Sequence, residues 1–279
     1  MNKILRKVEL VKDIWEMVIE SPNVAKKGKA GQFVIVMPEE KGERVPLTIA
    51  NSDAQKGTVT LIFMVVGTST RKLAKVKEGT DIYAFIGPLG HASEIKNFGT
   101  CVMVAGGVGT APIYPIAKAL KAAGNRVITI QGARTKDLLF WVDMMRSVSD
   151  EHIITTDDGT FGRKGLVTEP LKELLEKDTE KKIGNIYGIG PAIMMKFVAK
   201  TTKPFGVHTI VSLNSIMVDG TGMCGGCRVA VGGKTMFTCV DGPEFDGHLV
   251  DWDLLMARHK IYCTEEKCSL DKYVKECGL

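Results

Sequence analysis

The residues best suited to metal chemistry lie near the end of the chain, in the run Asp219-Gly-Thr-Gly-Met-Cys224-Gly-Gly-Cys227. Two cysteines separated by two residues can bind one metal centre from a tight loop. The glycines leave the backbone amides free to point at the sulfur atoms. This loop is therefore a candidate metal site, and the carboxylate of Asp219 is a further candidate ligand.

A third thiol is expected to reach the same loop through a hairpin. The strand-like segments Val229–Val231 and Lys234–Phe237 flank Gly232-Gly233, and a two-residue glycine turn of this kind is typical of a β-hairpin. Folding back at this turn predicts that Cys239 lies beside Cys227. The sequence thus predicts that three thiolates converge.

The loop alone leaves the chemistry of this site open. Its cysteines fit a structural zinc site with Asp219 or a histidine as the fourth ligand, an iron–sulfur cluster, or a set of buried free thiols. Six of the seven cysteines follow residue 223, and without a secretory signal this asymmetry favours a metal site over a disulfide scaffold. The other four cysteines are expected to be free thiols, three on a terminal helix and one in the core: Cys263, Cys268, Cys277 and Cys101.

A second chemical signal is the glycine-rich segment Gly106-Gly107-Val108-Gly109-Thr110-Ala111-Pro112, between an apolar run and a helix-like segment. In this context the amides at the start of a helix can bind a pyrophosphate. The spacing is not G-x-G-x-x-G, so a tight strand-to-helix connection is the alternative. The segments Thr156–Gly162 and Tyr187–Met195 follow two other strands and could border the same crevice, although each alone could be only a turn.

Two segments of the first hundred residues carry groups that suit a diphosphate, Arg44-Val45-Pro46-Leu47-Thr48-Ile49 and Gly67-Thr68-Ser69-Thr70-Arg71. They bring cations, hydroxyls and a glycine amide to the ends of strands or helices. Without further context, the alternative interpretation is that both segments are exposed strand ends without a ligand, which is the more common case.

The elements that position these segments begin with a run of short strands. Up to about residue 97, β-type segments separated by Gly, Pro, Asn and Asp predict a small antiparallel barrel. The expected strands are Lys3–Val11, Ile14–Glu20, Gln32–Met37, Pro46–Ala50, Thr58–Val66 and Thr80–Ile86, with a helix-like segment at Thr70–Val76.

From Thr100 onward strands and helices alternate, which predicts a parallel sheet. The expected strands are 101–105, Arg126–Gln131, His152–Thr155 and Asn185–Ile189, and the expected helices are Ile113–Ala123, Leu138–Val148, Val167–Glu176 and Pro191–Thr201. A strand-like segment Gly206–Leu213, the cysteine loop, the hairpin and polar helix-like sequence complete the chain.

Composition and charge narrow the class of protein. The net charge of +5 comes from 37 basic and 32 acidic residues spread along 279 positions, without the basic face of a nucleic-acid binder. The N-terminus alternates polar and apolar residues and lacks the apolar core of a signal peptide. The uncharged stretch Phe98–Ala117 contains glycines and prolines, which favour a buried strand, a turn and a helix start over a membrane span. We therefore expect a cytoplasmic protein that binds neither nucleic acid nor membrane.

The order of these motifs resembles that of the ferredoxin–NADP reductase superfamily, and more closely the electron-transfer subunits of dihydroorotate dehydrogenase B. The chain looks most similar to the small (alpha) subunits of NADH-dependent reduced ferredoxin:NADP oxidoreductases, also described as sulfide dehydrogenase subunits. The resemblance covers nearly the whole chain. It rests on five motifs in the family's order: Arg44–Thr48, Gly67–Thr70, Gly106–Pro112, Gly190-Pro191 and the cysteine loop.

The resemblance implies a ferredoxin reductase-like fold of the β-barrel plus α/β class. An antiparallel FAD-binding β-barrel at residues 1–98 would be followed by a parallel-sheet NAD(P)-binding domain at 99–205 and a small [2Fe-2S] cluster-binding domain at 206–279. The implied cofactors are FAD, a [2Fe-2S] cluster and NAD(H). NAD(H) is preferred to NADP(H) because the family's small subunits favour it, although Arg134 after the second strand could meet a 2′-phosphate.

The resemblance also assigns site residues. Those along the isoalloxazine and ribityl chain of FAD would be Pro46, Leu47, Thr48 and Ile49, and those at its pyrophosphate Gly67, Ser69 and Thr70. Those facing the dinucleotide would be Gly107, Val108, Gly109, Thr110 and Asp157, with Gly190 and Pro191 near the nicotinamide. The implied cluster ligands are Asp219, Cys224, Cys227 and Cys239. No side chain is implied as a catalytic acid or base, because the chemistry belongs to the cofactors.

Three positions depart from the family's pattern. The flavin motif usually has an arginine three residues before its hydroxyl residue, but here Val45 stands there and Arg44 is one position earlier. Ile189 stands where many relatives have a cysteine before the Gly-Pro pair. Asp219 stands where the dihydroorotate-type relatives have their first cluster cysteine, so it is expected either to bind iron directly or to act from outside the ligand set.

The function implied by the resemblance is electron transfer between NAD(H) and a partner, by way of FAD and a [2Fe-2S] cluster. The implied partner is a larger flavin and [4Fe-4S] subunit, similar to the small subunit of glutamate synthase, that handles NADP(H) and ferredoxin in a heterodimeric, electron-bifurcating complex. The nearest alternative is the electron-transfer subunit of dihydroorotate dehydrogenase B, which would have cysteine in place of Asp219. The alternative from another class is a zinc-stabilised, non-enzymatic binding module with a vestigial nucleotide fold.

Overall fold

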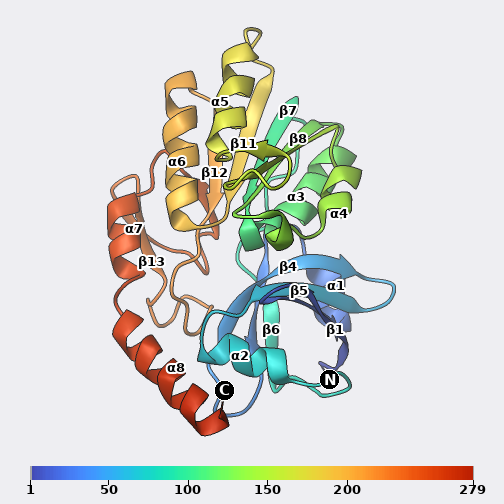
Figure 1. Cartoon of the computed structure of the whole chain (residues 1–279), viewed down its shortest axis with the longest axis vertical. Coiled ribbons are helices and arrows are strands. Elements are labelled where there is room, and N and C mark those ends of the chain that lie inside the picture. Colours follow the sequence, from blue (N-terminus) through green and yellow to red (C-terminus); the bar gives the residue numbers. More distant parts are fainter. Residues whose placement is uncertain (1, 279) are drawn as a thin grey trace.

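The fold is described from a computed structural model in which residues 2–278 are placed (Figure 1). Met1 and Leu279, the outermost residues of the expected first and third domains, lie outside the described residues. The described chain contains a six-stranded sheet, a seven-stranded sheet and a two-stranded hairpin. Within it, no helix combines the length and the apolar character needed to cross a lipid bilayer.

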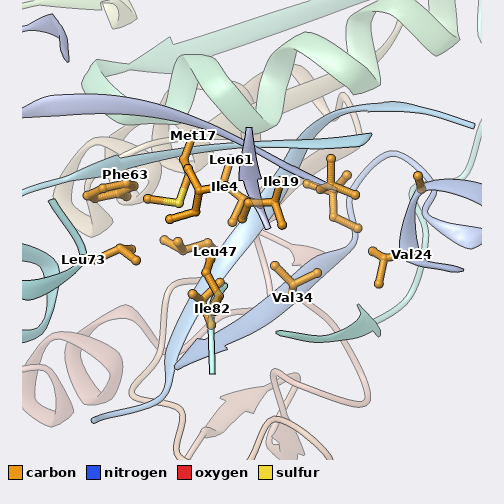
Figure 2. Packing of buried hydrophobic residues seen from close by; sticks show 14 residues of the cluster. Ile4, Met17, Ile19, Val24, Val34, Leu47, Leu61, Phe63, Leu73 and Ile82 are labelled. Atoms are coloured by element: carbon orange, nitrogen blue, oxygen red, sulfur yellow. The ribbon is translucent and has the colours of Figure 1, made fainter. Parts of the chain in front are cut away.

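The first sheet is the expected antiparallel barrel. Its strands are β1 (Ile4–Val11), β2 (Ile14–Glu20), β3 (Phe33–Met37), β4 (Val45–Asp53), β5 (Thr58–Met64) and β6 (Ala84–Leu89), hydrogen-bonded in the order β1-β2-β5-β4-β3-β6. Alternate side chains of these strands point inward, as the pleat requires. Figure 2 shows the resulting core, in which Met17, Leu61 and Phe63 face Leu47 and Ile82.

The strand expected at Thr80–Ile86 has other bounds in the structure, because the first residues of this segment pair with the N-terminal strand and only the later ones belong to β6. Residues 79–82 cross to the other edge of the sheet, where Ile4 N–H donates to the Thr80 carbonyl at 2.9 Å and Lys3 pairs with Asp81. The hydrogen-bonded strand β6 then starts only at Ala84 and pairs with β3. These contacts close the barrel, which local sequence patterns do not reveal.

Two helices accompany the barrel. Helix α1 (Pro22–Lys27) was not expected; it buries Val24 and Ala25 and has a proline at its start, where a missing N–H is tolerated. Helix α2 (Thr68–Lys75) confirms the helix-like segment and buries Leu73 in the barrel core.

The second sheet is mainly parallel and confirms the β/α alternation. Its strands are β7 (Thr100–Gly106), β8 (Arg126–Ala133), β9 (Glu151–Thr156), β10 (Arg163–Lys164), β11 (Ile183–Ile189), β12 (Thr209–Ser212) and β15 (Glu244–Asp246), in the order β10-β9-β8-β7-β11-β12-β15. Helices α3 (Thr110–Ala122) and α4 (Val142–Ser147) pack on one face, and α5 (Thr168–Lys177) and α6 (Ala192–Thr202) on the other (Figure 1). A sheet covered on both faces explains the continuous apolar run in β7.

The last part of the chain is joined to this sheet and is not separate from it. Strand β12 continues the parallel order beside β11, and β15 pairs antiparallel with β12. The segment after residue 206 therefore begins within the nucleotide-type sheet. The hairpin of β13 (Arg228–Val231) and β14 (Lys234–Phe237) follows, and then α7 (Trp252–Arg258) and α8 (Cys263–Cys277), which lies beside α2 of the barrel (Figure 1).

The barrel and the parallel sheet are also held together by a buried carboxylate. Glu16 on β2 is only 7% exposed. It accepts a hydrogen bond from the indole Nε1 of Trp141 at 3.1 Å and pairs with Arg6 at 3.0 Å. A buried carboxylate needs such partners, so this contact fixes the α4 region against β2.

A second carboxyl group lies where the three parts of the chain meet. The hydroxyl of Ser93, in the segment that leaves the barrel, donates to Glu244 Oε1 on β15 at 2.5 Å. Around this pair, Ser93 N–H donates to the Ala30 carbonyl and Leu213 N–H to that of Pro243, both at 2.9 Å. Burial raises the pKa of Glu244 to about 7.

This pKa makes stability depend on pH with a defined sign. The folded state keeps the Glu244 proton that the unfolded chain releases near its ordinary pKa of 4.5, so the free energy of unfolding falls as pH rises from about 4.5 to 7 and stays low above that. The group should contribute up to about 3 kcal/mol to this fall.

We expect thermal unfolding of Glu244→Gln to depend less on pH between about 4.5 and 7 than that of the wild type. Glu94→Gln removes an exposed carboxylate from the same junction and should keep the wild-type dependence; equal curves for Glu244→Gln and the wild type would contradict the assignment.

Candidate functional site

The four predicted cluster ligands are brought together as two pairs. Sγ of Cys227 lies 3.2 Å from Sγ of Cys239, and Sγ of Cys224 lies 3.4 Å from Oδ1 of Asp219. The hairpin expected at Gly232-Gly233 produces the first pair, because both glycines have positive φ and Val231 pairs with Lys234 across the turn. The expected approach of Cys239 to Cys227 is thus confirmed, whereas Cys224 is paired with Asp219 and not with the other thiols.

The carboxylate of Asp219 is ionised and accepts hydrogen bonds from backbone amides of its own loop. One carboxylate oxygen accepts from Thr221 N–H at 3.1 Å, and the other from Met223 N–H and Cys224 N–H at 3.0 Å each. These hydrogen bonds, first among them the one from the Thr221 backbone, lower the pKa of Asp219 to about 2. The carboxylate is therefore available as an anionic ligand throughout the neutral range.

The paired arrangement suits a two-iron cluster, in which each iron takes two protein ligands. The spacing Asp219-x4-Cys224-x2-Cys227 is that of plant-type [2Fe-2S] sites with aspartate in the first position. Amides also point at sulfur, since Gly226 N–H lies 3.4 Å from Cys224 Sγ and Cys239 N–H 3.5 Å from Cys227 Sγ. Among residues 2–278, no three His, Cys, Asp or Glu side chains gather closely enough to hold one ion.

The cysteine pair is packed against the barrel. Cys227 and Cys239 are each 2% exposed and form an apolar cluster with Phe33 and Ile35 of β3. Gly220, at φ +75°, lies so close to Ile35 that a Cβ there would be 2.7 Å from its Cγ1. The loop therefore requires glycine at position 220, where it packs against β3, the neighbour of β4 in the sheet.

The predicted flavin segments lie on β4 and at the start of α2. Pro46, Leu47 and Thr48 are on β4, opposite Ile35, Val34 and Phe33 of β3. At α2, the Thr70 hydroxyl accepts from Gly67 N–H at 3.1 Å, so it shapes the turn that starts the helix. Strand β3 thus contacts both the predicted flavin strand, with which it pairs, and the cysteine pair, against which it packs.

The two predicted nucleotide loops are in backbone contact. β7 and β11 are neighbours in the sheet, and their ends carry Gly106–Gly109 and Gly190-Pro191. A Cβ on Gly109 would be 2.1 Å from the Ile189 carbonyl oxygen, and one on Gly190 would be 3.0 Å from the Gly106 carbonyl oxygen. The expectation that both loops border one crevice agrees with this placement.

Two other predicted nucleotide residues are placed differently. Thr110 is 1% exposed and its hydroxyl lies 3.4 Å from Gln131 Nε2, so its side chain supports the loop from inside. Asp157 follows β9, two strands away from β7, and its N–H donates to the Ala133 carbonyl at 3.1 Å. It lies near Arg134 at the end of β8, farther along the same edge of the sheet.

The remaining cysteines are placed as the sequence predicted. Cys101 is fully buried on β7, and burial raises the pKa of its thiol to about 12. The other three are exposed on α8: Cys263, Cys268 and Cys277.

Arg71 belongs to a segment that the sequence predicted to suit a diphosphate, but it was not among the predicted FAD residues. Its Nε is buried and, among the described residues, has no hydrogen-bond partner. The sequence shows that the family's arginine is missing at position 45. Only the packing of α2 shows that the Nε of Arg71 is buried without an acceptor in the part of the chain that the structure describes.

Two family models match the chain. Residues 103–200 match an oxidoreductase NAD-binding domain. Residues 214–251 match the iron–sulfur cluster binding domain of dihydroorotate dehydrogenase B. The second range contains all four predicted cluster ligands.

Relatives match over almost the whole chain. A Thermotoga maritima homologue of the dihydroorotate dehydrogenase B (NAD(+)) electron transfer subunit is 48% identical over 278 residues, which are 100% of this chain and 97% of the relative. The electron transfer subunit of Clostridium perfringens is 32% identical over 252 residues, 90% of this chain and 97% of the relative.

A solved structure of NADH-dependent reduced ferredoxin-NADP oxidoreductase, described in terms of flavin-based electron bifurcation, contains a chain that superposes with a TM-score of 0.92. That chain is 47% identical, and the match covers 98% of each chain. With its antiparallel barrel, its NAD-binding domain and its iron–sulfur binding domain, the chain belongs to the family of dihydroorotate dehydrogenase B-type electron transfer subunits, which are oxidoreductases of ferredoxin reductase-like fold.

Proposed function

We propose that the protein transfers electrons between NAD(H) and a larger partner subunit, with FAD and a [2Fe-2S] cluster as its resident cofactors. Flavin supplies exchange of a two-electron hydride with the nicotinamide, and the cluster supplies one-electron transfer. The chain's own residues bind and orient these groups. The observation that carries the proposal is the placement of the cysteine pair against β3, next to the strand that carries the predicted flavin residues.

The proposed partner is a larger flavin and [4Fe-4S] subunit that handles NADP(H) and ferredoxin. Support comes from the 47% identity over 98% of the chain to a component of NADH-dependent reduced ferredoxin-NADP oxidoreductase. The exposed thiol of Cys224 and the side chain of Met223, which is 88% exposed, leave this edge of the cluster site open to such a partner. We propose a cytoplasmic heterodimer, with NAD(H) as the preferred nucleotide.

The second candidate is the electron transfer subunit of a dihydroorotate dehydrogenase B complex. It is favoured by the family match at residues 214–251 and by relatives such as that of Clostridium perfringens. Asp219 in place of the first cluster cysteine favours the first candidate. The two differ in the partner, so reduction of NADP(+) with ferredoxin, or oxidation of dihydroorotate, by the complex that copurifies with this chain distinguishes them.

The direct test is an absorption spectrum of anaerobically purified protein before and after NADH, with iron and acid-labile sulfide measured on the same sample. We expect flavin bands that bleach with NADH, together with about two irons and two sulfides per chain. A colourless protein that contains only zinc, and stays colourless after reconstitution with FAD, iron and sulfide, would contradict the proposal and support the zinc-stabilised binding module.

Direct ligation by Asp219 is tested by its replacement with cysteine. A carboxylate is a harder and less covalent ligand than a thiolate. Asp219→Cys should therefore still assemble a [2Fe-2S] cluster, but with a midpoint potential shifted by several tens of millivolts, where about 59 mV corresponds to a tenfold change for one electron. The measurement is a redox titration followed by EPR.

The control is Val218→Cys, which adds a thiol directly before Asp219, on a side chain that is 54% exposed and outside the four predicted ligands. It should leave the potential and the EPR spectrum unchanged. An unchanged potential and spectrum in Asp219→Cys would instead assign Asp219 to a role outside the ligand set.

A further inference from the structure

The family's flavin motif has an arginine that this chain lacks at position 45, and the structure shows which cation is placed to replace it. Arg44, the nearest candidate in sequence, is exposed directly before β4. Arg71 lies in the first turns of α2, the helix whose first residues include the proposed FAD pyrophosphate ligands Ser69 and Thr70. The question is therefore which of the two arginines faces the diphosphate.

Arg71 is the cation of α2 that has no partner among the described residues. Lys72 is paired with Glu39 at 2.7 Å, and the ammonium of Lys75 lies 5.0 Å from the ring centroid of Tyr273. Arg71 forms no ion pair, and its Nε is buried without a hydrogen bond. A buried nitrogen of this kind destabilises the protein unless an acceptor is supplied, and a diphosphate supplies several.

Helix α8 limits the direction in which Arg71 can extend. Thr68 and Lys75, three residues before and four residues after Arg71, both contact α8: the hydroxyls of Thr68 and Ser269 are 3.1 Å apart, and Lys75 lies over Tyr273. Residues at this spacing share one helix face, so Arg71 lies on the face that α8 covers. Figure 1 shows α8 alongside α2.

Helix geometry then directs the side chain toward the predicted diphosphate. Side chains of a helix lean toward its N-terminus. The rise from Gly67 to Arg71 is about 6 Å, which an arginine side chain spans. The first turn already binds an anionic oxygen, since the Ser69 hydroxyl donates a hydrogen bond to the carboxylate of Glu43.

We propose that Arg71, held in place by α8, is the cation that binds the FAD diphosphate, and that Arg44 is not. The inference rests on the proposed function, since it assumes that the barrel binds FAD. A planar guanidinium can donate two parallel hydrogen bonds to phosphate oxygens, which an ammonium cannot do. The C-terminal helix thereby stabilises the flavin site from the far end of the chain.

The test compares FAD with riboflavin, which has the same ring but no phosphate. Full-length protein, depleted of flavin but still containing its iron, is titrated with each, and binding is followed by quenching of flavin fluorescence. Arg71→Gln should weaken FAD binding by about tenfold to a hundredfold, the effect of losing a charge-assisted pair, and should leave riboflavin binding unchanged. Arg71→Lys should bind FAD with intermediate affinity. Arg44→Gln, the matched control, should bind FAD like the wild type.

The outcomes separate the inference from the function on which it rests. Unchanged FAD affinity in Arg71→Gln, or an equal loss for FAD and riboflavin, would overturn the inference while the proposed function stands, and so would loss of FAD by Arg44→Gln alone. A wild-type chain that binds neither compound would contradict the flavin part of the proposed function, and the inference with it. Iron content and thermal unfolding of each variant show whether it is folded.

Discussion

Replacement of Cys227 by serine is expected to abolish the cluster while leaving flavin and its reduction by NADH intact. Cys227 is 2% exposed, lies 3.2 Å from Cys239 in sulfur-to-sulfur distance, and packs with Phe33 and Ile35. A hydroxyl in this apolar site is a poor, hard ligand for iron. Loss of an outer partner of a metal site already costs 10–100-fold in metal affinity, so loss of this ligand should cost more than about a hundredfold.

The measurements are iron and sulfide content, the EPR spectrum of the reduced protein, and bleaching of the flavin bands by NADH. The flavin should still bleach, because the nucleotide loops lie at the end of a different sheet, but electrons should no longer reach a one-electron acceptor. Cys268→Ser, an exposed position on α8, should retain the wild-type iron content. Two irons and an unaltered EPR spectrum in Cys227→Ser would rule out Cys227 as a ligand.

The second large effect is expected from Gly109→Ala, which should slow reduction of the flavin by NADH. The new Cβ would lie 2.1 Å from the carbonyl oxygen of Ile189, and neither backbone can yield without separating the two loops that end β7 and β11. A displacement of about 1 Å in a binding site can cost a hundredfold in rate. We expect kcat/KM for flavin reduction to fall by about that factor.

Gly106→Ala is the matched control in the same loop. Its Cβ would lie 2.3 Å from Sδ of Met194, and a methionine side chain can move aside, so the rate should fall by less than about tenfold. Rates are measured by rapid mixing with NADH, and flavin and iron contents show that the other sites are loaded. A wild-type rate in Gly109→Ala would show that the loop does not bind the nucleotide.

The two types of sheet were predictable because their signals are local. Alternation of apolar residues gave strands β1 and β2, and the apolar run of β7 followed by a glycine loop and a helix gave the parallel sheet. The turn of the hairpin at Gly232-Gly233 was predicted to the residue, since a two-residue turn with positive φ depends only on its own residue types. The comparisons then confirmed the fold and the family that the order of motifs had indicated.

Contacts between distant segments were not predictable from local patterns. Closure of the barrel by residues 79–82, the pairing of β15 with β12, and the contact of Glu16 with Trp141 each join segments that are far apart in sequence. Such contacts are chosen by how whole surfaces pack, so a short window of sequence does not contain them. The same reason explains why Thr110, which belongs to a nucleotide motif, has a buried side chain.

The sequence by itself determined the ligand types and their spacing: the Cys-x-x-Cys pair, the returning Cys239, and Asp219 separated from Cys224 by four residues. Only the tertiary structure decided that these four groups divide into two pairs and that one pair is buried against β3. It also decided that, among the described residues, Arg71 has a buried nitrogen without an acceptor, whereas Arg44, nearest the motif in sequence, is exposed. The physical reason is that residue type and spacing determine which ligand a side chain can bind. Burial and contacts with distant segments determine whether that side chain is still available for the ligand.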